Sequence, residues 1–97
     1  MNTIGIAASA LNAFTTNQSV AANNVANVDS PGYKAAVAQE EDVKSGGVKA
    51  VVSKGSDPVE LSKEAVNMML NSNLFTANAK TVKATVEMTQ SILDIKV

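Results

Sequence analysis

Asp29-Ser30-Pro31-Gly32-Tyr33 is the stretch that decides the fold. Asp favours turns through its short polar side chain, Pro31 disfavours a helical conformation of Ser30, and Gly32 can adopt backbone angles that other residues avoid. We therefore predict that a helix over residues 1–28 ends at this turn, after which the chain changes direction.

The segment before the turn is predicted to be one long amphipathic helix. It carries no charge before Asp29, and one set of its residues recurs alternately three and four positions apart, which places that set on one helical stripe. The stripe comprises Ile4, Ala7, Leu11, Phe14, Gln18, Ala21, Val25 and Val28. Gln18 is its polar break, and such a residue can select the register of a coiled coil. A simple core-facing stripe is the alternative for each residue.

A second helix is predicted over residues 59–97, where neither Pro nor Gly interrupts the chain after Pro58. Two apolar stripes are expected along it. The first comprises Leu70, Leu74, Ala77, Thr81, Ala84, Met88, Ser91 and Ile95, and the second comprises Phe75, Ala79, Val82, Val86 and Leu93. We expect the first stripe to meet the opening helix and the second to remain for other subunits.

Residues 29–58 are predicted to form a turn followed by a loop or a short hairpin. Val48-Lys49-Ala50-Val51-Val52 has strand character and lies between Gly46-Gly47 and Gly55. Glu40-Glu41-Asp42 is interpreted as a solvated acidic loop, because no further groups positioned for acid-base or cation chemistry are evident. The fold class is thus mainly α, a single domain over residues 1–97 with two terminal helices in an antiparallel hairpin or coiled coil.

Composition argues against most catalytic and binding chemistry. The 97 residues include no Cys and no His, which removes thiolate nucleophiles and the common zinc ligands. We assign no catalytic residue, no cofactor and no metal. Tyr33 and Lys34 could form an acid-base pair, but a Tyr beside a turn more commonly anchors the loop with its hydroxyl in water. The net charge of -1, without any Arg, argues against nucleic acid as a partner.

The unequal helices predict assembly. The closing helix would be about 55 Å long and the opening helix about 40 Å, at about 1.5 Å per residue. Part of the longer helix and one of its stripes would stay exposed in an isolated hairpin, and other copies of the chain would cover them. No segment is apolar enough to insert in a membrane, and the opening residues lack the basic start of a cleaved signal peptide.

The residues around the turn resemble the N-terminal signature of the flagellar rod, hook and hook-associated proteins. The matching positions are Asn23, Asn24, Ala26, Asn27, Ser30, Pro31, Gly32, Tyr33 and Lys34. Residues 59–69, 75–83 and 87–88 are similar to the C-terminal helix of the same family. The region between is much shorter than the β-rich outer domain of most members, so the resemblance is greatest to a short proximal rod protein. A shortened paralogue without a flagellar role is the alternative.

This resemblance implies a structural subunit of the flagellar basal-body rod, self-assembling through its terminal helices. It further implies export through the flagellar type III apparatus without a cleaved signal, and partnership with other rod subunits and with itself. The resemblance also implies an assembly face on the two helices of this chain. This face comprises Ile4, Leu11, Phe14, Val25, Leu70, Leu74, Phe75, Val82, Val86 and Met88.

Two other classes of function remain as alternatives. A cytosolic helical adaptor, or a binding module like an export chaperone, would use the same exposed stripes on a different partner. A small enzyme would need a pocket with a perturbed titratable group at Tyr33 and Lys34. The signature favours the rod subunit.

Overall fold

A computed structural model describes residues 3–96, and their side chains as far as residue 93. The chain consists of helix α1 (Thr3–Ala26), strand β1 (Ala36–Asp42), strand β2 (Val48–Lys54) and helix α2 (Leu61–Lys96). The predicted mainly α fold is confirmed, and the short hairpin is present. Met1, Asn2 and Val97, which the prediction included in the helices, lie outside the described residues, as does the side chain of Ile95.

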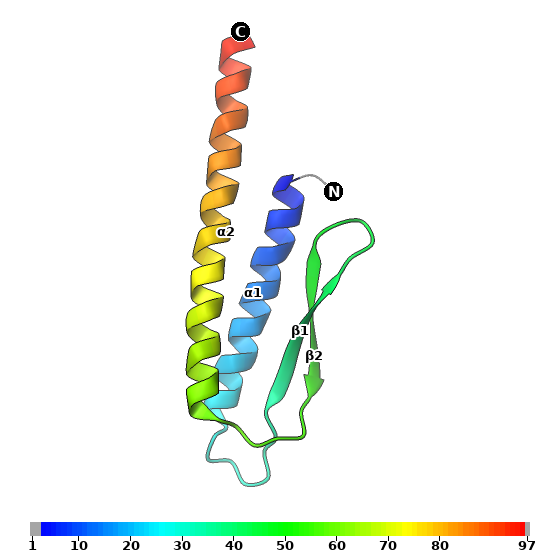
Figure 1. The fold of residues 1–97 in the computed structure, drawn as a ribbon, viewed down its shortest axis with the longest axis vertical. Coiled ribbons are helices and arrows are strands. Elements are labelled where there is room, and N and C mark those ends of the chain that lie inside the picture. Colours follow the sequence, from blue (N-terminus) through cyan, green and yellow to red (C-terminus); the bar gives the residue numbers. More distant parts are fainter. Residues whose placement is uncertain (1–2, 97) are drawn as a thin grey trace.

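The molecule is an elongated three-part arrangement with α1 in the middle (Figure 1). α2 runs antiparallel to α1 along one side, and the β-hairpin lies against the other side. Within the described residues, α2 contacts no element except α1. α2 has 36 residues and α1 has 24, so α2 is longer by about 18 Å and extends beyond the N-terminal end of α1.

α1 ends at Ala26, two residues before the predicted end at Val28. The helix is rich in Ala, which has the highest intrinsic helix propensity. Its hydroxyl side chains bond back to the preceding turn, as when Thr15 Oγ1 donates to Leu11 O at 2.9 Å. This local bonding satisfies the hydroxyl groups, so the uncharged helix needs few polar partners elsewhere.

Strand β1, the first strand of the possible hairpin, was not placed by the prediction, because Glu40-Glu41-Asp42 was interpreted as an acidic loop. It pairs antiparallel with β2 over seven residues, from Ala36 opposite Lys54 to Asp42 opposite Val48. The connecting turn uses Gly46 and Gly47 at φ angles of 100° and 87°, a conformation that favours glycine. Because β2 is apolar and has high strand propensity, its pairing with β1 holds the more polar β1 in an extended conformation.

The hydrogen-bond pattern of the hairpin fixes which backbone groups point outward. Gly55 N–H donates to Ala35 O at 3.0 Å, and Val43 N–H donates to Gly47 O at 3.1 Å. Because bonded pairs alternate along an antiparallel ladder, the even-numbered residues of both strands direct their N–H and C=O groups away from the hairpin. These residues are Ala36, Ala38, Glu40 and Asp42 in β1 and Val48, Ala50, Val52 and Lys54 in β2.

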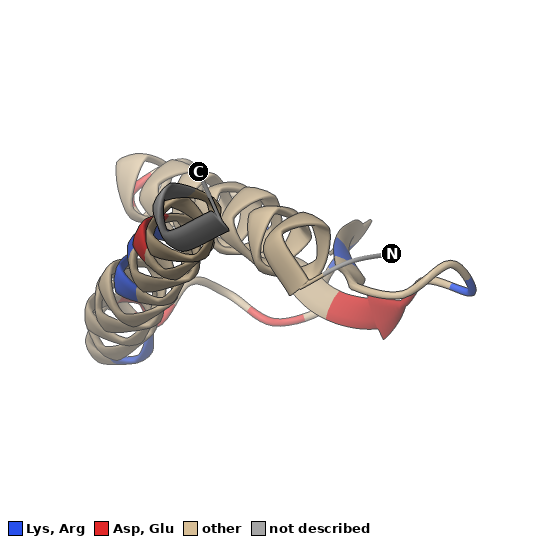
Figure 2. Ribbon diagram, turned by 90° about the horizontal axis from the view of Figure 1, so that it is seen from above, with Lys and Arg blue, Asp and Glu red and all other residues tan. Residues whose placement is uncertain are grey.

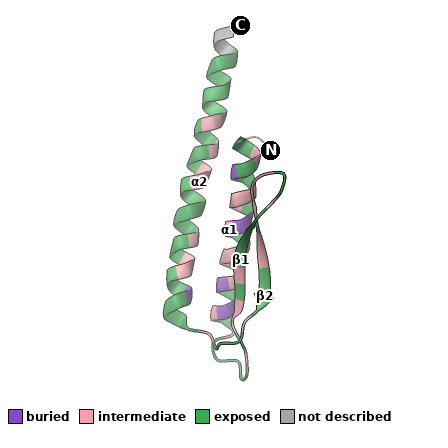
Figure 3. Cartoon of the chain, turned by 45° about the vertical axis from the view of Figure 1, so that its right-hand side comes forward, coloured by how far each residue is buried: buried purple, intermediate pink, exposed green. Residues whose placement is uncertain are grey.

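The apolar core is small and lies on α1. Its fully buried apolar residues within the described chain are Ala7, Ala13 and Ala21, and Figure 3 shows that burial is concentrated on this helix. Small side chains let the hairpin and α2 approach the helix closely on its two sides. They bury little apolar area, so hydrophobic burial alone supplies a modest part of the stability.

The two stripes of α2 have the opposite roles to those predicted. Ala79 and Val82 of the second stripe are half-buried, and Asn78 between the two stripes donates to Ala7 O of α1 at 2.6 Å. In the first stripe, Leu70 is 52% and Met88 64% exposed. The second stripe therefore meets α1 in the same chain, and the first stripe faces away.

Two matched substitutions on α2 test this assignment of faces. Ala79→Glu should lower the free energy of unfolding by about 1–3 kcal/mol, because it places a charge against α1. Ala77→Glu lies on the exposed stripe and should change it by no more than about 0.5 kcal/mol. Urea unfolding followed by circular dichroism measures both values. Equal losses in the two variants would contradict the assignment.

Candidate functional site

The side chain of Asn24 joins three elements of the fold. It is 1% exposed, and its Nδ2 donates to Ala36 O at 3.0 Å and to Glu64 Oε1 at 3.2 Å. Its Oδ1 accepts from Ala36 N–H at 2.9 Å and from the Tyr33 hydroxyl at 3.2 Å. The amide thus uses both donors and both acceptor positions, so its burial carries no penalty for unsatisfied groups.

The two bonds between Asn24 and Ala36 imitate a strand pairing. Ala36 directs its N–H and C=O outward from the start of β1, and one side-chain amide satisfies both groups. The edge of β1 therefore needs no neighbouring strand at this point. This contact fixes where the chain returns to α1 after the turn.

Tyr33 links the turn to the end of α1. Its hydroxyl accepts from Asn23 Nδ2 at 3.2 Å and donates to Asn24 Oδ1 at 3.2 Å. The expected anchoring of Tyr33 against the helix is therefore confirmed, and two side-chain amides contact its hydroxyl. With its hydroxyl engaged by two amides, Tyr33 holds the loop.

The remaining signature residues shape the turn itself. Asn27 Nδ2 donates to Asn23 O at 2.9 Å, and Asn27 Oδ1 accepts from Ser30 Oγ at 3.1 Å. Gly32 has a φ of 73°, which strains any residue with a Cβ. Ala26, Pro31 and Lys34 are exposed. The signature is therefore a structural device that ends α1 and positions β1, with no catalytic arrangement in it.

Glu64 is a site residue that the sequence pattern did not reveal. Its side chain is 6% exposed and lies in the first turn of α2, where the positive end of the helix dipole stabilises a carboxylate. Its bond to Asn24 attaches the start of α2 to the end of α1. An acidic residue in the first turn was the available signal, but exposed acids at helix starts give the same pattern.

Asn78 supplies a second polar attachment between the two helices. Its bond to Ala7 O lies fourteen residues further along α2 than the bond of Glu64 to Asn24. Side-chain bonds with defined geometry at both ends of the contact fix the register of the antiparallel pair. The small Ala residues between them could not do so.

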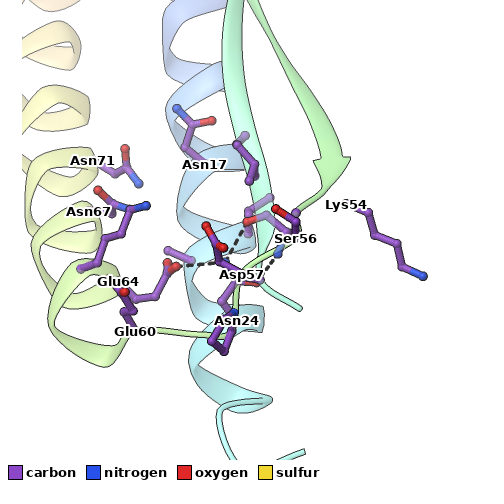
Figure 4. A pocket seen from close by; sticks show the side chains of 18 residues that line it. Asn17, Asn24, Lys54, Ser56, Asp57, Glu60, Glu64, Asn67 and Asn71 are labelled. Carbon is purple, nitrogen blue, oxygen red and sulfur yellow. Dashed lines mark hydrogen bonds between the residues drawn. The ribbon is translucent and has the colours of Figure 1, made fainter. Parts of the chain in front are cut away.

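A polar pocket of about 580 Å³ lies beside Asn24, where α1, β1 and the start of α2 meet. Figure 4 shows Asn17 of α1 and Asn67 and Asn71 of α2 on opposite walls of this pocket. Its polar lining consists of amides and carboxylates together with Lys54, Lys63 and Ser56. In the part of the chain that the structure describes, no group of three His, Cys, Asp or Glu side chains is placed to hold a metal.

A second hollow of about 380 Å³ lies between α1 and α2 and is lined by Phe14, Gln18 and Phe75 among others. Gln18, the polar break in the predicted stripe, is half-buried, and its Oε1 is buried without a hydrogen-bond partner among the described residues. The predicted role of Gln18 in selecting register stays a prediction. Asn78 and Glu64 make the register-fixing bonds that the structure does show.

The predicted assembly residues divide into two groups by their exposure. The exposed group comprises Ile4, Leu70, Leu74, Phe75, Val86 and Met88, and the half-buried group comprises Leu11, Phe14, Val25 and Val82. Phe75 belongs to the side of α2 that faces α1 despite its partial exposure. Leu70, Leu74 and Met88 lie on the opposite side of α2. These three residues share one face, because residues that are four positions apart, or seven or a multiple of seven apart, lie on the same side of a helix.

Two antiparallel helices, a small hairpin and a long exposed apolar stripe define an elongated helical protein of structural type. Residues 4–34 match the model of the family described as flagella basal body rod protein. This segment spans most of α1 and the turn with its signature, and the match supports the flagellar basal-body rod protein family. The family resemblance seen in the signature is thus confirmed. No curated protein matches the chain.

Asn24→Asp tests whether the polar junction holds the fold. The substitution preserves shape but removes both Nδ2 donors and places a second carboxylate beside Glu64. We expect the free energy of unfolding to fall by about 2–4 kcal/mol, measured by urea unfolding. Asn23→Asp, at an exposed position one residue earlier, is the matched control and should cost clearly less.

A second substitution makes this test specific to the bond between the helices. Glu64→Gln in the Asn24→Asp background removes the like-charge contact and provides an amide donor for the carboxylate introduced on α1. Part of the lost stability should return. A double variant that is no more stable than Asn24→Asp alone would contradict the direct pairing of these two side chains.

Proposed function

We propose that this chain is a structural subunit of the flagellar basal-body rod, and that it contacts neighbouring subunits through the outward stripe of α2. The observation that carries the proposal is the apolar character of the side of α2 that faces away from α1. The family match supports a rod-type structural component. The short hairpin between the helices supports a proximal position in the rod.

The outward stripe of α2 is continuous and uncharged. It comprises Val66, Leu70, Leu74, Ala77, Thr81, Ala84, Met88 and Ile92. Its large side chains are about half exposed or more, including Val66 at 56% and Ile92 at 52%. One flank of the stripe carries Lys80, Lys83 and Glu87, which are offset from it by a fraction of a helical turn, and the other flank carries uncharged Asn and Thr residues. An apolar stripe between polar flanks is typical of a helix that packs against another protein.

The charge distribution supports the same conclusion for α1. Figure 2 shows charged residues on α2 and on the hairpin but none on α1. A helix without charges can be enclosed by neighbours on its remaining surface without the desolvation cost of a buried charge. Ile4 and Ile6 at its N-terminal end are exposed and extend the apolar surface available there.

The part of α2 beyond α1 provides a third argument. Met88, Ile92 and Leu93 are exposed. Because Asn78 bonds to Ala7 near the start of the antiparallel α1, these three residues lie beyond the N-terminal end of α1. No other described element of the chain reaches that portion. Within an assembled rod, α1 and α2 of adjacent subunits would cover it, so the partners of this chain are other rod subunits and further copies of itself.

Export through the flagellar type III apparatus completes the proposal. The chain has a thin core of small side chains, and such a core opposes unfolding less than a large one does. No helix in the described residues is long and apolar enough to cross a membrane. The proposed location is the basal body, as the family match supports.

Ala77→Glu tests the outward stripe. It should leave the isolated chain folded but reduce incorporation into basal bodies at least tenfold, because a charge buried between subunits without a partner costs several kcal/mol. Ala65→Glu, exposed on α2 but off the stripe, should incorporate normally. Quantitative immunoblotting of purified basal bodies measures both. Normal incorporation of Ala77→Glu would exclude the outward stripe as an assembly surface. A wild-type chain found only in the cytosol would favour the alternative function of a cytosolic adaptor.

A further inference from the structure

We propose that the hairpin carries a second interface, in which the outer edge of β2 in one copy pairs antiparallel with the outer edge of β1 in the next copy. This contact goes beyond the helical assembly proposed above, because it uses different elements on the other side of α1. Its occupant is a second copy of the same chain, joined head to tail.

α1 satisfies only one end of each strand edge. Asn24 bonds to the outward N–H and C=O of Ala36 in β1, and Ser9 Oγ accepts from the outward N–H of Val48 in β2 at 3.1 Å. The other outward backbone groups of the two strands are the C=O of Val48 and both groups of Ala38, Glu40, Asp42, Ala50, Val52 and Lys54. Across the described chain, no hydrogen bond is seen to these groups, and a further strand would satisfy them.

The open part of each edge is also accessible. Among the described residues α2 does not reach the hairpin, and the sheet has only its two strands. Val52 of β2 is 49% exposed and Asp42 of β1 is exposed. The open segments lie at opposite ends of the hairpin, because α1 covers the beginning of each strand and leaves its end uncovered.

The charges of the two edges are complementary. β1 carries Glu40, Glu41 and Asp42, and β2 carries Lys49 and Lys54. In the hairpin, Lys49 faces Glu41, but Lys54 faces Ala36 and so has no acidic partner directly across the strands. Pairing between copies can place Lys54 opposite Glu40, whose Oε1 accepts from Asn17 and whose second oxygen remains for the lysine. Opposite charges facing each other across strands are stabilising.

The direction of the strands supports pairing between copies that point the same way. β1 and β2 are antiparallel within one chain, so β1 of one copy and β2 of an equally oriented copy are antiparallel without further rotation. When Lys54 of one copy lies opposite Glu40 of the next copy, and not opposite its Ala36, the two copies are displaced by four residues. This displacement is about 13 Å along the strands. Such a contact between unlike surfaces is open-ended when the repeat does not close on itself, as a rod requires.

Charge reversal on each edge tests the proposal. Glu40→Lys and Lys54→Glu should each reduce self-association at least threefold in sedimentation velocity experiments. An equimolar mixture of the two should recover it, since each variant then offers the edge that the other needs. Lys63→Glu, an equal charge change on α2, is the control. Unchanged association of both variants, or a mixture that does not recover, would overturn the proposal, as would a wild-type chain that stays monomeric at every concentration.

A cross-link identifies the pairing directly, because the chain contains no Cys. The proposed register places Ser53 of one copy opposite Glu41 of the next. Ser53→Cys and Glu41→Cys chains, mixed under mild oxidation, should form mixed disulfide dimers several times faster than either variant alone. The same preference should hold in the Ala77→Glu background, which separates failure of this edge from failure of the helical interface. Equal rates in all combinations would contradict the register.

Discussion

The fold depends on the buried amide of Asn24. It bonds to the backbone of β1, to the hydroxyl in the turn and to the carboxylate of Glu64 at the start of α2. The apolar core consists of small alanine side chains, which can pack in several registers with similar energy. Hydrogen bonds are directional, and a buried amide that loses a partner is strongly penalised. The specific arrangement therefore comes from polar bonds, while apolar burial supplies a limited part of the stability.

The same bonds decide which side of α2 faces α1. Periodicity identifies two apolar stripes on α2 but does not distinguish the stripe used within the chain from the stripe left outside. Glu64 and Asn78 lie on the same side of the helix as Val82, and both bond to α1. These polar residues select the second stripe. Their hydrogen bonds leave no periodic signal in the sequence, and for that reason the predicted faces were reversed.

Local chemistry was sufficient to predict the turn and both helices, because Pro31, Gly32 and Pro58 restrict the backbone directly. It was not sufficient for β1, whose acidic end has low strand propensity. That strand exists through two long-range contacts, the pairing with β2 and the bonds of Ala36 to Asn24. Neither contact leaves a periodic signal. Asn24 was recognised as part of a family signature, but its hydrogen-bond partners emerged from the structure alone.

The central position of α1 bears on how copies can join. α2 and the hairpin each cover one side of α1 and, in the described residues, do not touch each other, so the molecule has two separate flanks with different chemistry. One flank carries the outward apolar stripe of α2, and the other carries strand edges of complementary charge. Two unlike flanks favour contacts between different surfaces of neighbouring copies over contacts between identical ones. Such contacts need not close on themselves, and they generate a polar, extended assembly from a chain whose own core is small.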